Sequence, residues 1–275
     1  MSRAKRAAAA GLKVAAAGAD LVRRPATGIV VLIYHRVGER STASAIDLPT
    51  AAFERQVAEL AGAGRLLTID DAAELLAAGT SIDGPPKVVL SFDDGTADWV
   101  DVVLPVLAAH NAPAVFYVAT DFVERAEAFP GGGAAISWSG LGELVASGLA
   151  TIGSHTHSHR LLDRAGGPEA AAELDRSVSL LGERLGVECH HFAYPKALLG
   201  SSAAETEVRA RFRTAAVAGT AANRPGATDL HRLARTPIQR GDGMTWFRRK
   251  AAGGMALEDR ARSVLNRRRY AGAVS

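Results

Sequence analysis

Short apolar runs alternate with amphipathic stretches along most of this chain. The apolar runs are rich in β-branched residues and are predicted to be buried strands at 28–34, 88–92, 114–118, 190–194 and 214–217. The amphipathic stretches carry apolar residues three or four positions apart and are predicted to be helices at 50–63, 141–146, 169–185 and 203–212. Regular alternation of strand and helix indicates an α/β fold with a mostly parallel sheet, and the order suggests a barrel.

Two segments are less regular. A short strand is expected at 66–69, followed by a helix to Ala78 with Asp70 or Asp71 as its N-cap. The three glycines at 131–133 indicate a loop before Trp138. Such a loop either borders a binding groove or simply connects two elements.

Two adjacent carboxylates follow one of the buried runs. Asp93 and Asp94 come directly after 88–92 and precede Gly95, a residue able to end a strand. In α/β proteins the carboxyl ends of strands are where sites are built. Because side chains alternate along a strand, we expect the two aspartates to point to opposite sides and to have different roles. The alternative is that they cap the next helix, expected near Asp98.

Three histidines lie within five residues in the segment from Ile152 to His159. His155 and His159 are four positions apart, so one helical turn would place both imidazoles on one face. Two imidazoles and one carboxylate hold a divalent metal and leave positions open for water. The alternatives are an exposed histidine-rich loop or a structural metal site. His157 is expected to point away.

Composition changes this picture little. The chain has 275 residues, a formal net charge of +3 and one cysteine, Cys189, which excludes an internal disulfide. Length and apolar content suit one large soluble domain, and no nucleic-acid partner is expected. Basic residues gather at both ends of the chain: Arg3, Lys5, Lys13, Arg23 and Arg24, then Arg260, Arg262, Arg267, Arg268 and Arg269.

Residues 1–26 are predicted to form a basic, alanine-rich helix. Lys13 and Asp20 interrupt its apolar run, so it makes a weak secretion signal, and no stretch is apolar enough to span a bilayer. We therefore expect a cytoplasmic protein whose basic ends make peripheral contact with anionic membrane. The alternatives are a solvated helix, or export with an atypical signal.

The paired motifs resemble a known family. Ser91-Phe-Asp-Asp-Gly95 and His155-Thr-His-Ser-His159 are similar to the first two motifs of the NodB-homology polysaccharide deacetylases, carbohydrate esterase family 4. Segments 32–37, 192–195 and 233–237 resemble further strands and motifs of that family. The resemblance implies a distorted (β/α) barrel with about seven parallel strands. It places the deacetylase domain at 27–250 and leaves 251–275 as a basic C-terminal tail.

The resemblance also implies roles for individual residues. Asp94, His155 and His159 would hold one divalent ion, with Zn²⁺ expected and Co²⁺ or Ni²⁺ as alternatives. Asp93 would be the catalytic base, and the backbone N–H of Lys196 would stabilise the oxyanion. Four further residues are expected around the metal or the substrate: His35, Tyr194, Pro195 and Arg235.

The chain also departs from the family pattern. Ala193 stands where many members have an arginine that orients the base, and Arg235 is expected to supply that guanidinium. Lys196 replaces an aromatic residue. The general-acid motif has no clear match, which leaves His231 and His191 as weak candidates.

The expected activity is metal-dependent removal of N-acetyl groups from a sugar or polysaccharide, by attack of metal-bound water on the amide carbonyl. The alternatives are a sugar O-acetyl esterase and a catalytically impaired glycan-binding member of the family. The sequence does not define the glycan or the oligomeric state.

Overall fold

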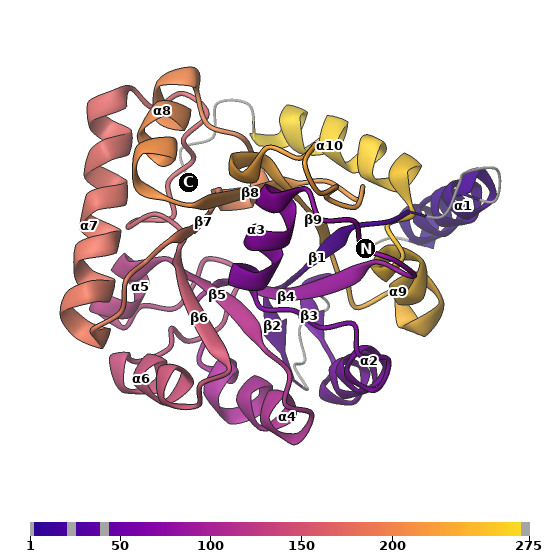
Figure 1. Cartoon of the computed structure of the whole chain (residues 1–275), viewed down its shortest axis with the longest axis horizontal. Coiled ribbons are helices and arrows are strands. Elements are labelled where there is room, and N and C mark those ends of the chain that lie inside the picture. Colours follow the sequence, from indigo (N-terminus) through magenta and orange to yellow (C-terminus); the bar gives the residue numbers. More distant parts are fainter. Residues whose placement is uncertain (1–2, 21–25, 39–43, 271–275) are drawn as a thin grey trace.

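The computed structural model describes residues 3–20, 26–38 and 44–270. Within these residues, seven parallel strands close into a barrel, which confirms the predicted fold class (Figure 1). The barrel strands, in spatial order, are β1 (Ile29–Tyr34), β4 (Lys87–Asp94), β5 (Ala114–Val118), β6 (Ala150–Ser154), β7 (His191–Ala193), β8 (Thr214–Ala218) and β9 (Leu233–Pro237). A small two-stranded sheet pairs β2 (Arg36–Val37) with β3 (Asp47–Leu48) just beyond the end of β1.

Helices surround this barrel (Figure 1). The α-helices that follow β3 are α2 (Thr50–Gly62), α3 (Ile69–Ala78), α4 (Leu104–Ala109), α5 (Thr120–Arg125), α6 (Trp138–Ala146), α7 (Gly167–Leu185), α8 (Ser202–Arg211), α9 (Gly243–Ala251) and α10 (Ala256–Tyr270). A π-helix, η1 (Trp99–Val103), precedes α4, and short 3₁₀ turns form η2 (Pro195–Ala197) and η3 (Leu230–Arg232).

Alternation along the strands decides which side chains fill the barrel. In β1, Ile29 and Val31 belong to the interior cluster, whereas Val30, Leu32 and Tyr34 pack outward against the helices. A strand with apolar residues on both faces is what a parallel sheet covered by helices requires. The same alternation in β4 puts Val89 inside and Val88, Leu90 and Phe92 outside, so Asp93 belongs to the inward-facing set.

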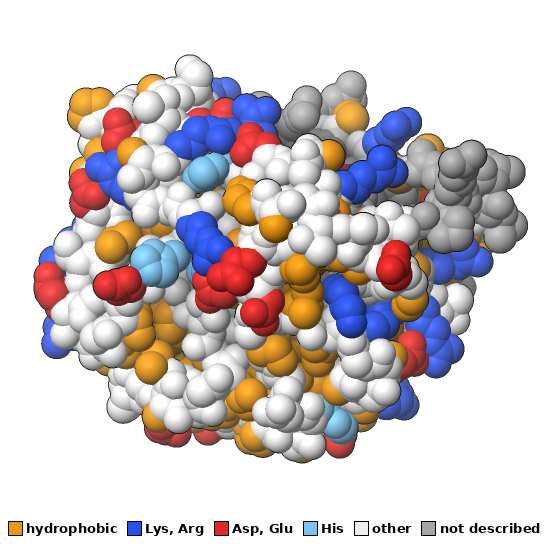
Figure 2. All heavy atoms as spheres, viewed as in Figure 1, with side chains coloured by type: hydrophobic (Ala, Val, Ile, Leu, Met, Phe, Trp, Pro, Cys, Tyr) orange, Lys and Arg blue, Asp and Glu red, His pale blue; other side chains and the backbone are white. Residues whose placement is uncertain are grey.

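Helix α3 covers the amino end of the barrel. Its residues Ile69, Ala72 and Leu76 share the interior apolar cluster with β1 and β4, and α3 lies across the centre of the view in Figure 1. Figure 2, in the same orientation, shows acidic side chains gathered over this helix. The opposite end of the barrel, where the strands finish, is therefore the end left for a site.

The segment before α3 differs from the sequence expectation. Leu66 makes only an isolated bridge to Val88, and no strand forms at 66–69. The N-cap is Thr68, whose hydroxyl accepts the Asp71 N–H at 3.0 Å. The prediction of an Asp70 or Asp71 cap was wrong by two to three positions because Asp70 and Asp71 lie inside the first turn, where carboxylates favour the helix dipole.

The terminal helices pack together. Helix α1 (Arg3–Asp20) lies against α10, and the two residues that interrupt its apolar run make the key contacts. The buried Lys13 ammonium contacts Asp242, which also accepts from Lys250 at 2.9 Å. The Asp20 carboxylate accepts the Met255 N–H at 2.7 Å. Segment 1–26 is thus a docked helix over its described part, and most of segment 251–275 is helix α10.

Candidate active site

The first carboxylate, Asp93, is held by a buried arginine. Arg235, from β9, donates from Nη1 to Asp93 Oδ1 at 2.6 Å and from Nη2 to Oδ2 at 2.9 Å. Burial by itself would raise the pKa of Asp93, but the Arg235 guanidinium, His155 and His35 together lower it below its usual value. The expectation that Arg235 supplies a guanidinium to this carboxylate agrees with the geometry, and the paired carboxylate stays ionised.

The second carboxylate, Asp94, reaches the same place by a different route. Its parity along β4 would point it outward, but its φ of 88° turns the backbone at the strand end. Asp94 Oδ1 consequently lies 3.7 Å from His155 Nε2, while Asp93 Oδ2 lies 4.0 Å from the same nitrogen. The prediction that the two aspartates point to opposite sides was therefore wrong for their carboxylates, because a left-handed residue interrupts the pleat.

The two histidines converge without a helix. Residues 155–160 form a loop after β6, and His159 has a φ of 60°. The helical turn expected from their spacing is absent from this described segment, and the positive φ values of Thr156 and His159 bring the rings together instead. The ring centroids are 5.1 Å apart.

A backbone carbonyl fixes the orientation of His155. Its Nδ1 lies 2.7 Å from the Ala193 carbonyl oxygen, which can only accept, so Nδ1 carries the proton and Nε2 is left as the ligand atom. Burial lowers the pKa of His155 to about 4, so the ring is neutral at physiological pH. A neutral imidazole is the form that binds a metal ion. Ala193, which stands where many family members have an arginine, thus orients a metal ligand through its backbone carbonyl.

Asp94, His155 and His159 form a candidate metal site. Each offers one ligand atom, and these atoms all lie within 4.8 Å of one another. Asp94 Oδ1 is 3.3 Å from His159 Nε2 and 3.7 Å from His155 Nε2. Ligands about 2.0–2.2 Å from a tetrahedral ion stand roughly 3.3–3.6 Å apart, so these three residues fit a divalent ion such as zinc.

Three more of the expected residues lie at this end of the barrel. His35 follows β1, is partly exposed, and its charge contributes to the lowered pKa of both Asp93 and Asp94. Pro195 is buried in η2 just after β7. Lys196 is exposed on the same turn with a φ of 54°, and the role of its backbone N–H stays a prediction.

Tyr194 does not reach the site. It continues the alternation of β7, in which Phe192 faces outward, and its ring packs edge-on against Phe192 with centroids 4.9 Å apart. The expectation that Tyr194 lies around the metal or substrate was wrong, because the residue after Ala193 returns to the helix-facing side.

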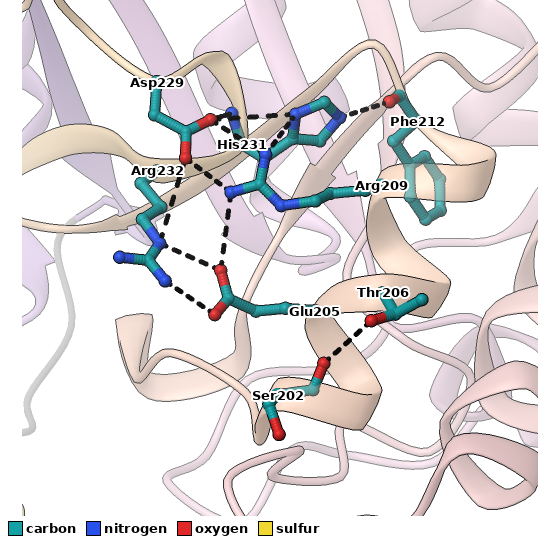
Figure 3. A network of polar contacts seen from close by, with 8 residues as sticks. All are labelled: Ser202, Glu205, Thr206, Arg209, Phe212, Asp229, His231 and Arg232. Atoms are coloured by element: carbon teal, nitrogen blue, oxygen red, sulfur yellow. Dashed lines mark hydrogen bonds and ion pairs between the residues drawn. The ribbon is translucent and has the colours of Figure 1, made fainter.

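Both candidate general acids lie at the amino end of the barrel. His191 contacts Asp70 of α3 at 3.1 Å and Thr214, the first residue of β8, at 2.9 Å. His231 Nε2 lies 2.8 Å from the Phe212 carbonyl, within a surface network that joins α8 to η3 (Figure 3). His191 is the first residue of β7 and His231 lies just before β9. Neither can therefore donate a proton at the carboxyl end of the strands, the mouth of the barrel, and both assignments were wrong.

One interior residue was missed from the sequence. Tyr117 of β5 pairs in register with Asp93, and the Arg235 guanidinium carbon lies 5.1 Å from its ring centroid. The ring therefore supports the arginine that holds Asp93. The sequence could have indicated this position, because Tyr117 lies two residues after Val115 and so faces the same side of β5, the barrel interior.

His157 is separate from the cluster, as expected. Its Nδ1 lies 2.9 Å from the Thr120 hydroxyl, and its Nε2 lies 3.5 Å from Asp121. The middle histidine of the motif is thus attached to α5.

Fold and site together define a class: a (β/α) barrel with a two-histidine, one-carboxylate cluster beside an arginine-held carboxylate, at the carboxyl ends of its strands. Residues 81–215 match the family model described as polysaccharide deacetylase. The chain therefore carries a polysaccharide deacetylase domain of the NodB-homology type, carbohydrate esterase family 4, and the resemblance seen in its motifs is confirmed.

Solved structures agree on the fold. The deacetylase PplD of Streptococcus pyogenes, solved in complex with acetate, is 21% identical with a TM-score of 0.71, over 83% of this chain and 99% of that chain. IcaB from Ammonifex degensii is 26% identical with a TM-score of 0.69, over the same shares. BC0361, a polysaccharide deacetylase from Bacillus cereus, is 23% identical with a TM-score of 0.68, over 81% of this chain and 68% of that chain. No curated protein matches the sequence.

Proposed function

We propose that this protein removes N-acetyl groups from an N-acetylated sugar or polysaccharide of the cell envelope by metal-dependent hydrolysis. The observation that carries the proposal is the Asp94, His155 and His159 cluster next to the Asp93–Arg235 pair. An open three-ligand site beside an ionised carboxylate is typical of metal-assisted hydrolysis. Zn²⁺ suits this donor set, and Co²⁺ or Ni²⁺ would fit the same ligands.

The metal supplies Lewis acidity toward water and toward the amide oxygen when it is bound. The chain supplies the proton acceptor. Asp93 accepts a proton from the attacking water, and Arg235 fixes both of its oxygens so that the carboxylate does not rotate away. The backbone N–H of Lys196 is proposed to donate to the oxygen on which negative charge develops.

A proton donor for the leaving amine is also needed. His191 and His231 are excluded by their position, whereas His35 directly follows the end of β1, at the mouth of the barrel. We assign His35 as that donor. This assignment replaces the weaker role, around metal or substrate, that the sequence suggested.

Acetate release tests the proposal. Purified protein loaded with Zn²⁺ is expected to release acetate from N-acetylated chitooligosaccharides and to lose this activity in chelator. Acetylxylan is the comparison substrate, because its acetyl groups are esters. Faster release from acetylxylan would favour the O-acetyl esterase, and no release from either would favour a glycan-binding protein without turnover.

We further propose that the protein works in the cytoplasm at the membrane surface, on sugars attached to a biosynthetic carrier. No helix in the described ranges is both long and apolar enough to cross a bilayer. Val14 on α1 and Val264 and Leu265 on α10 are more than half exposed, next to the basic ends of the sequence. Lys13 is buried against Asp242 and is not available to lipid, whereas Arg23 and Arg24 lie outside the described residues.

Cell fractionation checks this location. The tagged, full-length protein is expected in the cytoplasmic and membrane fractions, with the membrane-bound share released by high salt, since contacts with anionic lipid are screened. Recovery of a shortened form from the medium would contradict the proposal and would move the substrate to extracellular polymer.

A further inference from the structure

A glycine-rich loop is attached directly to the segment that follows the two site carboxylates. The Ile136 N–H donates to the Gly95 carbonyl at 2.8 Å, and the Ala97 N–H donates to the Ala134 carbonyl at 3.0 Å. Thr96 and Ala135 form an isolated antiparallel bridge between these bonds. The end of the loop, residues 134–136, therefore pairs with residues 95–97, directly after Asp94 at the mouth of the barrel.

Arg36 ties this loop to the segment that follows β1, the strand next to β4 in the barrel. Its Nε donates to Asp47 Oδ1 of β3 at 2.5 Å, and its Nη1 donates to the Gly131 carbonyl at 2.9 Å and also to the Gly132 carbonyl. Arg36 is 3% exposed and Asp47 is fully buried. One guanidinium thus connects the small β2–β3 sheet to the tip of the glycine loop.

The position of Arg36 makes this connection relevant to substrate. Arg36 directly follows His35 at the end of β1, and the next N–H, from Val37, donates to Asp98 at 2.7 Å. Gly131 and Gly132 themselves are exposed. A buried ion pair adds little net stability once its desolvation is counted, so stability alone explains poorly why a charge is buried under an exposed loop.

We propose that Arg36 is a positioning residue for glycan binding. It holds the 131–133 loop as a wall beside the mouth of the barrel, against which the sugar units next to the acetylated one bind. This inference rests on the proposed deacetylase function and adds that binding of neighbouring units depends on the loop. A wall kept in place before binding spares the entropy of ordering it when a long substrate arrives.

Two neighbouring glycines give a matched test. Both have positive φ, 82° for Gly132 and 112° for Gly133, so alanine strains the backbone at either position. A methyl group on Gly133 would lie 3.1 Å from Arg36 Cδ and 3.2 Å from Thr96 Cγ2, whereas one on Gly132 meets no described atom within 4 Å. Only Gly133→Ala crowds Arg36 and Thr96, so that the loop and the Arg36 side chain must shift relative to one another.

Gly133→Ala is expected to raise KM for an N-acetylated tetrasaccharide on the order of tenfold, with kcat little changed. This is the pattern expected when a variant binds the substrate and the transition state more weakly by the same amount. KM for a single-sugar substrate and the Zn²⁺ content are expected to stay at wild-type values. Gly132→Ala is expected to resemble the wild type in all three measurements. Equal behaviour of the two variants, or equal effects on short and long substrates, would overturn the inference.

Arg36→Lys provides a second variant that keeps a charge beside buried Asp47. A single ammonium cannot reproduce the planar guanidinium that reaches the carboxylate and both carbonyls, so the same KM shift is expected. Arg65→Gln is its control, because Arg65 also donates to two backbone carbonyls, of Pro86 at 2.8 Å and Ala251 at 2.5 Å, but near the start of β4. A KM shift in Arg65→Gln equal to that in Arg36→Lys would show a merely structural effect. Wild-type protein that releases no acetate would instead refute the deacetylase function itself.

Discussion

The His155→Ala and His159→Ala proteins are expected to lose their divalent metal and more than about 100-fold of their acetate release, since even residues that only support metal ligands cost 10–100-fold. Each substitution removes one of three protein ligands whose atoms lie within 4.8 Å of one another. The two that remain, one imidazole and the Asp94 carboxylate, form an incomplete site. Metal analysis after dialysis, together with acetate release at saturating Zn²⁺, measures both losses.

His157→Ala is the matched control for these two variants. It removes an imidazole from the same loop, but one that contacts Thr120 and Asp121 of α5. Metal content is therefore expected to stay stoichiometric in this protein. Stoichiometric metal in both His155→Ala and His159→Ala would remove the three-residue cluster from consideration.

The barrel was readable from the sequence because its strands are covered on both faces. Largely apolar runs such as 88–92 and 114–118 mark such strands clearly. Strand β5 coincides with its predicted run, and β4 extends its run by one residue before it and two after it. The alternation of side chains along β4 and β9 also places Asp93 and Arg235 inside the barrel. The alternation pattern does not show which strands are neighbours. The contact between Asp93 and Arg235, which are 142 positions apart, is therefore visible only in the closed barrel.

Most of the wrong predictions concern residues at strand ends, where the local backbone decides which way a side chain points. Asp94 reaches the cluster only because its φ is positive, and His159 does so for the same reason. Such conformations are uncommon for non-glycine residues and leave no periodic signal in the sequence. The prediction for Tyr194 was wrong for the opposite reason: the alternation of side chains continued past the end of β7 and turned its ring toward the helices. Residue type made His191 and His231 candidates, but which end of a strand a residue occupies decides whether it can act.

The Asp93→Asn protein is expected to keep its metal and to lose 10²–10⁴-fold of kcat, the usual contribution of a positioned general base. The amide has the shape of the carboxylate but cannot accept the proton from water. Asp94, His155 and His159 are unchanged, so Zn²⁺ content is expected to remain near one per chain. Acetate release under saturating substrate, with metal analysis of the same sample, checks both statements.

A loss of folding must be separated from this loss of chemistry, because Asp93→Asn leaves the fully buried Arg235 without its anion. Breaking a buried ion pair from one side costs on the order of 3–5 kcal/mol, so a lower melting temperature is expected. Arg235→Met is the matched variant, since it breaks the same pair but keeps the carboxylate that accepts the proton. If Asp93 is the base, Arg235→Met retains more kcat than Asp93→Asn at comparable stability.

His35→Gln, which lacks the proposed proton donor but keeps both the Asp93–Arg235 pair and the metal ligands, should lose kcat without loss of melting temperature. Near-normal turnover in Asp93→Asn would assign the base to another group, and near-normal turnover in His35→Gln would do the same for the acid.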